Sequence, residues 1–185
     1  MSFVIFGIDL DIQSIAIIIL FILVIFCIIY PRVRSYRQNK FSEEMRNLRK
    51  SRNGQISYYI WKYTNEERVK RGIPALKYDF KLSKASYEHS KCMINNHYFA
   101  HNCKRHGDLS SRLVTVGVYR NYVGENIIHF PYKTHGVRRV AKEAVNGWMD
   151  SPGHMENILN ENFKRIGVGV YSSKHNMKIT QDFSD

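Results

Sequence analysis

Residues 166–183 read IGVGVYSSKHNMKITQDF, and this stretch decides the fold class of the chain. Apolar Ile166, Val168 and Val170 alternate with other residues up to the polar segment 172–176, and the alternation resumes at Met177. A side-chain period of two on both sides of a polar turn predicts a β-hairpin.

The sequence before the hairpin has a different period. Apolar side chains recur every three or four positions, which is typical of helices. Asp79 is a good N-terminal cap, and Gly72 followed by Pro74 is a termination signal. We expect helices over 56–71, 80–96, 108–116, 137–149 and 151–159. Helices on either side of a small antiparallel sheet are the economical arrangement, so the predicted fold class is α+β.

The N-terminal part is strongly apolar. Residues 12–30 carry no charged side chain and are almost all Ile, Leu, Phe and Val. As a helix they cover roughly the 30 Å of a bilayer's hydrocarbon core, so we predict one N-terminal transmembrane helix. The alternative is a cleaved signal peptide, which has a basic start, a shorter apolar run and small residues before the cut. The start here is acidic and the run is long, which favours a retained anchor.

The formal charge of +12, from 28 basic and 16 acidic residues, is unevenly distributed. Asp9 and Asp11 precede the apolar run and a basic segment follows it, so the positive-inside rule favours a cytoplasmic C-terminal domain. The basic segment either contacts anionic membrane lipids or is a solvated helical spacer. The predicted parts are a short N-terminal tail (1–11), the transmembrane helix (12–30), a basic juxtamembrane linker (31–55) and one domain (56–185).

Local motifs do not locate a functional site. Three cysteines are too few for a disulfide framework, and the chain lacks the His-Glu-x-x-His, Cys-x-x-Cys, Gly-x-Ser-x-Gly and P-loop patterns. Lys and Arg are spread over every part of the domain, so we expect no specific nucleic-acid partner.

A succession of short motifs across the domain is more specific. They are Phe99-Ala100-His101, Arg112-Leu113, GENI at 124–127, SPGHMENIL at 151–159 and TQDF at 180–183. In this order they resemble the CAP superfamily (cysteine-rich secretory, antigen 5 and pathogenesis-related proteins, or SCP domains), and most closely its disulfide-poor prokaryotic branch. The resemblance covers residues 57–183. It implies an α-β-α sandwich and favours an extracellular location.

The same resemblance implies a cleft lined by two histidines and two glutamates. Matched motif by motif, they are His101, Glu125, Glu143 and His154. Two imidazoles and two carboxylates suit Zn²⁺ or another divalent cation, so these four are the predicted metal ligands. His101 and His154 are the expected direct ligands, with the glutamates orienting them or a bound water. Glu125 and Glu143 are also the candidate catalytic residues.

Two functions fit this site. The first is a membrane-anchored CAP module that binds a lipid or another ligand in the cleft. The second is a metal-dependent, peptidase-like hydrolase, whose metal-bound water would be the nucleophile.

The remaining polar residues are expected to be structural. We expect His89 to be a core histidine and Asn126, Asn157 and Gln181 to be structural hydrogen-bonding residues. Cys92 and Cys103 are expected to be bridged if the domain lies outside the cell. The other histidines are predicted to lie on the surface: His97, His106, His129, His135 and His175.

Overall fold

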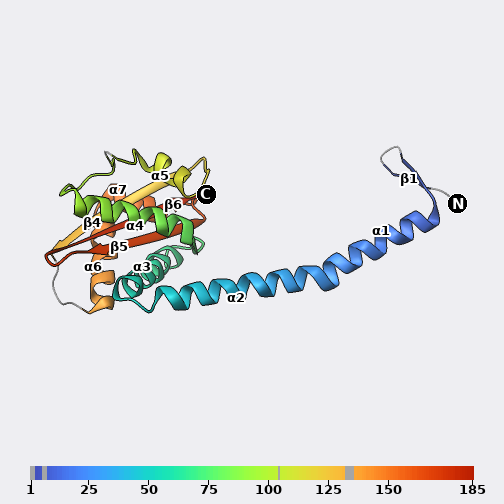
Figure 1. Cartoon of the computed structure of the whole chain (residues 1–185), viewed down its shortest axis with the longest axis horizontal. Helices are drawn as coiled ribbons and strands as arrows, with labels where there is room; N and C mark the ends of the chain where they lie inside the picture. The colour runs from blue at the N-terminus through green and yellow to red at the C-terminus, as the bar shows by residue number, and fades with distance from the viewer. Residues whose placement is uncertain (1–2, 6–7, 104, 132–135) are drawn as a thin grey trace. The chain divides into compact units, whose positions relative to one another are not determined.

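The computed structural model describes residues 3–5, 8–103, 105–131 and 136–185, and the chain divides into two compact units, 1–47 and 48–185. In the first unit, a short antiparallel pair of strands, β1 (Phe3–Ile5) and β2 (Ile8–Leu10), precedes the helical part. That part consists of α1 (Ile12–Val24), a π-helical turn η1 (Ile25–Ile29) and α2 (Tyr30–Leu48) (Figure 1).

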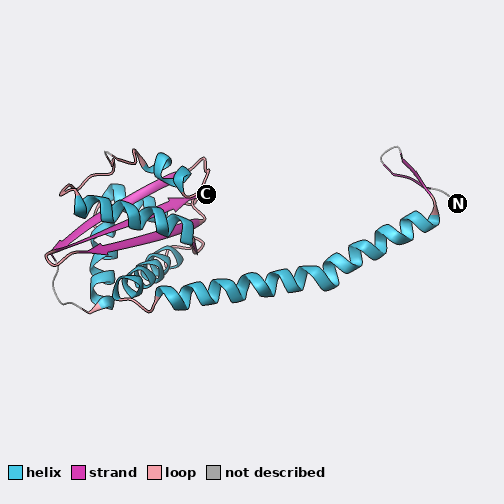
Figure 2. Cartoon of the chain, in the orientation of Figure 1, coloured by secondary structure: helices cyan, strands magenta, loops and turns pink. Residues whose placement is uncertain are grey.

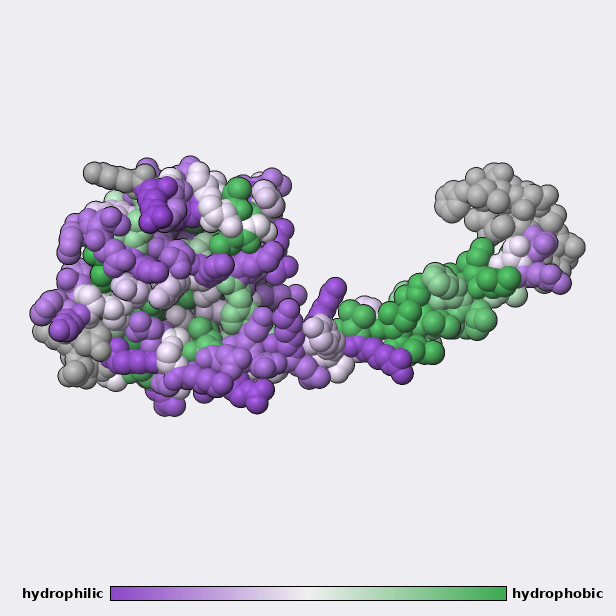
Figure 3. Space-filling view, viewed as in Figure 1, coloured by the Kyte–Doolittle hydropathy of each residue, from purple (hydrophilic) through white to green (hydrophobic). Residues whose placement is uncertain are grey.

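These helical segments form one run from Gln13 to Leu48, which is long and apolar enough to cross a membrane. Its apolar part is not buried inside the structure, and Figure 3 shows apolar side chains gathered along it. At 1.5 Å per residue, 36 residues extend about 54 Å, well beyond the hydrocarbon core. The predicted linker is therefore helical as far as Leu48, and the second unit begins eight residues before the predicted domain boundary at 56.

The second unit contains the helices and the hairpin that the sequence predicts (Figure 2). The helices are α3 (Arg52–Val69), α4 (Phe80–Asn95), α5 (Leu109–Thr115), α6 (Val137–Met149) and α7 (Pro152–Leu159). The strands are β3 (Lys77–Tyr78), β4 (Val123–Pro131), β5 (Arg165–Ser172) and β6 (Asn176–Ser184).

The sheet has the strand order β3-β5-β6-β4. The predicted hairpin is confirmed as β5 and β6, which pair antiparallel from Arg165 opposite Ser184 to Ser172 opposite Met177. β4 pairs antiparallel with β6 along its whole length, whereas β3 is parallel to β5. The sheet is thus antiparallel, as predicted, except at this two-residue edge strand, which makes it mixed. No run of alternating side chains that short can be read from a sequence.

The helices cover both faces of the sheet, as the α-β-α prediction requires (Figure 1). α3, α6 and α7 lie on one face over the larger hydrophobic core, which includes Ile60, Trp148, Ile166 and Phe183. Burying an aliphatic or aromatic side chain of this size contributes about 1.5–3 kcal/mol, so this core stabilises the unit. α4 and α5 lie on the other face, where Leu82 and Leu113 belong to a smaller apolar cluster.

α4 packs directly on β5 because two glycines remove the side chains between them. A Cβ atom on Gly167 would lie 2.2 Å from the Ser83 nitrogen, and one on Gly169 would lie 2.0 Å from the Tyr87 nitrogen. The serine side chains of α4 fill this narrow space, and the Ser83 hydroxyl donates to the Val168 carbonyl at 2.6 Å. This close contact places the polar face of α4 beside the candidate site.

Candidate functional site

Glu125 on β4 is the centre of the predicted site. It is 8% exposed, and its two carboxylate oxygens contact different partners. Oε1 lies 2.8 Å from Nδ1 of His101, and Oε2 forms an ion pair with the buried guanidinium of Arg112. Burial alone would raise the pKa of Glu125, but the hydrogen bond from His101 and the charge of Arg112 bring it below its ordinary value. Glu125 is therefore ionised, with both oxygens engaged.

Arg112 on α5 joins the surrounding loop to the strand. Its Nη1 donates to the carbonyl oxygens of His101 at 2.7 Å and of Gly107 at 3.2 Å, while Nη2 bonds to Glu125. A planar guanidinium offers several donors in fixed directions, so one side chain can hold both segments. The sequence motifs include Arg112, but we did not predict it as a site residue, because its partners come together only in the fold.

Two histidines beside Glu125 have pKa values shifted in opposite directions. The hydrogen bond to Glu125 raises the pKa of His101. Burial lowers the pKa of His89 to about 4, so this ring is neutral at physiological pH. His89 Nε2 lies 3.1 Å from the Ala100 carbonyl oxygen and 3.8 Å from Glu125. The prediction that His89 is a core residue is confirmed, and the core position lies against the site.

Asp182 lies opposite Glu125 on the neighbouring strand β6. It is fully buried; its Oδ2 accepts a hydrogen bond from Ser86 at 2.8 Å, and its Oδ1 has no partner among the described residues. Burial and the charge of Glu125 together raise the pKa of Asp182 well above its ordinary value. These effects favour the protonated form of Asp182, because a second buried carboxylate would repel the charge of Glu125.

His154 lies on α7, which contacts the edge strand β4. Its Nδ1 lies 2.9 Å from the Ser151 hydroxyl, and its carbonyl accepts from Asn126 at 3.0 Å. Burial and the nearby charge of His101 lower the pKa of His154. The structure thus brings His154 close enough to His101 for the charge of one ring to affect the other.

Asn126, Asn157 and Gln181 form the support that fixes α7 to the sheet. Asn157 Nδ2 lies 2.9 Å from Asn126 Oδ1 and 3.2 Å from the Glu125 carbonyl oxygen. Asn126 in turn donates to Gln181 at 3.1 Å. The prediction that these three residues are structural hydrogen-bonding residues is confirmed.

Glu143, the fourth predicted ligand, lies on α6. Its Oε1 accepts from Arg139 at 2.8 Å, one helical turn earlier, and 39% of its side chain is exposed. Among the described residues, a group of three potential ligand atoms within 4.8 Å of one another occurs elsewhere, at Cys92, Cys103 and His106. The four-residue metal site remains a prediction.

The other predicted positions have different outcomes. His97, His129 and His175 are exposed as expected, and His135 lies outside the described residues. His106 is half-buried beside Cys103, so it is less exposed than the other predicted surface histidines that the structure describes. The loop that returns from Cys103 to Gly107 carries it inward. Cys92 and Cys103 are free thiols in contact.

The sequence of the chain matches one family model and is similar to two bacterial proteins. The sequence model of the cysteine-rich secretory protein family (CAP) matches residues 61–183. YkwD, an uncharacterized protein of Bacillus subtilis, is 34% identical over 133 residues, which are 70% of this chain and 49% of that protein. YlbC, an uncharacterized membrane protein of the same bacterium, is 36% identical over 107 residues, 58% of this chain and 29% of that protein. The chain therefore spans about half or less of the length of these relatives.

Solved structures share the fold of the second unit. An extracellular protein from Bacillus anthracis that contains an SCP domain is 34% identical, with a TM-score of 0.59, over 70% of this chain and 40% of that one. An outer surface protein of Borrelia burgdorferi is 20% identical, with a TM-score of 0.61, over 70% and 92% of the two chains. The apolar helix, together with a relative described as a membrane protein, indicates a single-pass membrane protein.

Proposed function

Since the chain belongs to the cysteine-rich secretory protein (CAP) family, we propose that it is a membrane-anchored ligand-binding module. Its ligand site lies around His101, Glu125 and His154, and a divalent cation such as Zn²⁺ forms part of that site. The anchor and the basic helix that follows it keep the module at a lipid surface.

The observation that supports the cation is the way in which both imidazoles are held. Nδ1 of His101 is hydrogen bonded to Glu125, and Nδ1 of His154 to Ser151. Among the described residues, no hydrogen bond reaches Nε2 of either ring. Histidine ligands of metals commonly have one ring nitrogen fixed by a carboxylate or another polar group, with the other nitrogen on the metal.

The residues present fit a cation in distinct roles. His101 and His154 would supply Nε2 atoms, and Glu143 would supply a carboxylate oxygen. Glu125 would orient His101, because His101 and Arg112 already occupy its oxygens. The lowered pKa of His154 keeps that ring neutral, as a ligand must be. A bound Zn²⁺ would supply Lewis-acid chemistry, which is the basis of the hydrolase alternative.

We propose that the domain faces the cytoplasm, because the basic residues follow the apolar helix and the acidic ones precede it. The extracellular relative from Bacillus anthracis supports the opposite side. Protease treatment of intact cells tests this directly: the domain should be protected, and its digestion from outside would overturn the assignment.

Thermal unfolding of the full chain in detergent, with and without Zn²⁺, tests the cation site. A ligand at about 100 times its dissociation constant stabilises the folded state by roughly 2.7 kcal/mol, so we expect Tm to rise by several degrees. The shift should persist in a Cys92→Ser/Cys103→Ser protein, which removes the thiol ligands. It should be lost when His101→Ala and His154→Ala are added to that protein.

Persistence of the shift without both histidines, or its absence from the thiol-free protein, would contradict the proposal. A peptidase and esterase screen of the same proteins separates binding from hydrolysis. A metal-stimulated activity that His154→Ala removes would favour the hydrolase.

A further inference from the structure

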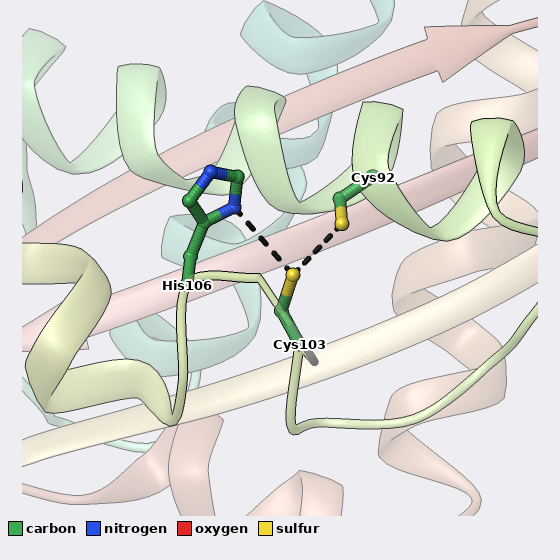
Figure 4. Close-up of side chains that lie close together, drawn as sticks. All are labelled: Cys92, Cys103 and His106. Atoms are coloured by element: carbon green, nitrogen blue, oxygen red, sulfur yellow. Dashed lines mark hydrogen bonds between the residues drawn. The ribbon is translucent and has the colours of Figure 1, made fainter.

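A second group of potential metal ligands lies at Cys92, Cys103 and His106 (Figure 4). The two sulfur atoms are 2.8 Å apart, and the Cys103 sulfur lies 3.5 Å from Nδ1 of His106. Cys92 and Cys103 are 8% and 2% exposed, and His106 is half-buried. Two thiols and an imidazole thus converge in a protected place, and none of the three belongs to the His/Glu site.

The backbone around Cys103 favours a ligand role for this loop. Cys103 and Gly107 exchange two backbone hydrogen bonds, of 2.9 and 2.7 Å, and Gly107 has a φ of +74° that closes the turn. Cys103 and His106 therefore have the Cys-x-x-His spacing within one tight loop, and short spacings of this kind are common in zinc sites.

The surroundings of Cys92 contribute the third ligand and further polar groups. Cys92 projects from the last turns of α4, and Asn96 Nδ2 lies 3.5 Å from its sulfur. The Tyr98 hydroxyl is buried near the two thiols and has no hydrogen-bond partner among the described residues. A buried hydroxyl left in this state indicates that the local polar network is incomplete.

We propose that Cys92, Cys103 and His106 bind one Zn²⁺ ion, separate from any ion at the His/Glu site. Two thiolates and one imidazole are a soft donor set that Zn²⁺ accepts, and the fourth tetrahedral position is left for water. With Zn–S near 2.3 Å and Zn–N near 2.1 Å, a tetrahedral ion separates its sulfur and nitrogen ligands by about 3.5 Å, which is the observed spacing. The same geometry separates two sulfurs by about 3.8 Å, so binding opens the thiol pair by about 1 Å. The ion replaces the thiol protons, which are released to solvent.

The ion would also stiffen the wall of the His/Glu site. The loop that carries Cys103 and His106 also supplies the carbonyl oxygens of His101 and Gly107, and both accept hydrogen bonds from Arg112. Arg112 in turn holds Glu125. A zinc ion on Cys103 and His106 therefore fixes the segment that positions the central carboxylate.

Cobalt substitution tests the site on the full chain in detergent, kept reduced with a phosphine. Cobalt bound to thiolates absorbs in the near ultraviolet through sulfur-to-metal charge transfer, and imidazole–carboxylate sites lack this band. We expect one equivalent of Co²⁺ to produce the band and Zn²⁺ to displace it. The band should persist in the His101→Ala/His154→Ala protein, so the test is independent of the His/Glu site.

Two single variants assign the ligands. Cys103→Ser should remove the band, and His106→Ala should weaken cobalt binding while leaving a thiolate band. Circular dichroism of each variant verifies that it is folded, and the wild-type titration alone remains decisive if Cys103→Ser does not fold. Absence of the band in the reduced wild type overturns the proposal. If the untreated protein contains a Cys92–Cys103 disulfide and the reduced protein binds no cobalt, the proposal is also overturned, and the two cysteines form a structural disulfide instead.

Discussion

The raised pKa of Asp182 makes a measurable prediction. Asp182→Asn keeps the size of the side chain and an acceptor for Ser86, and it removes the titrating group. The native state holds a proton on Asp182 that the unfolded chain releases above its ordinary pKa of 3.8. The wild type therefore loses stability relative to the variant as pH rises above this value, until the raised native pKa is passed.

The magnitude follows from one proton. The difference in free energy of unfolding between variant and wild type should be flat below about pH 3.8 and then grow by up to about 1.4 kcal/mol per pH unit. Urea titrations of the full chain in detergent measure this difference at each pH. Trp61 and Trp148 both lie in the globular unit and report its unfolding by fluorescence.

A second variant strengthens the measurement. The hydrogen bond from Ser86 lowers the pKa of Asp182. When Ser86→Ala is present in both proteins, the difference in free energy of unfolding between Asp182→Asn and the protein with Asp182 should therefore keep growing to a higher pH. Parallel stability curves for wild type and Asp182→Asn across the pH range would refute the argument. A variant that becomes progressively less stable than wild type as pH rises would show that Asp182 is an anion in the folded state.

Three further predictions follow from the same contacts. Arg112→Met leaves Glu125 buried without its countercharge and should destabilise the domain by about 3–5 kcal/mol in urea titrations; a change below 1 kcal/mol would contradict the buried ion pair. Glu125→Gln should return the pKa of His101 toward 6.5. The stability that His101 contributes at low pH, and that is lost as pH rises through its native pKa, should then disappear. NMR titration of the ring measures the pKa, and an unchanged value would exclude Glu125 as the cause of the shift. Gly167→Ala places a Cβ atom 2.2 Å from the Ser83 nitrogen and should cost at least about 1–3 kcal/mol, whereas wild-type stability would mean that α4 does not pack this closely on β5.

The fold was predictable where periodicity is strong. The hairpin of β5 and β6 and helices such as α4 and α6 have clear patterns, and the structure confirms them. β4 was not predicted, because it carries buried polar residues on both faces: Glu125 toward Asp182, and Asn126 toward Gln181. A strand whose buried positions are polar has no alternation of apolar and polar residues to reveal it.

The candidate site was only partly predictable for a related reason. Motif order predicts His101, Glu125, Glu143 and His154 as one site, and the contact between His101 and Glu125 comes from the fold. Arg112 and Asp182 act through burial and through partners distant in sequence, which no local pattern specifies. The sequence predicts His106 at the surface, and it cannot show the contact with Cys103, because that contact depends on one loop turn.

The serine-rich contact between α4 and the sheet has a calorimetric consequence. Ser83, Ser86 and Ser90 are buried against the glycine positions of β5 and the polar positions of β6. Exposure of polar surface lowers the heat-capacity change of unfolding, whereas exposure of apolar surface raises it. This half of the domain should therefore contribute little to ΔCp, and the stability curve of the domain should be broader than that of a domain with two apolar layers. Its resistance to cold should then exceed what its thermal midpoint alone would indicate.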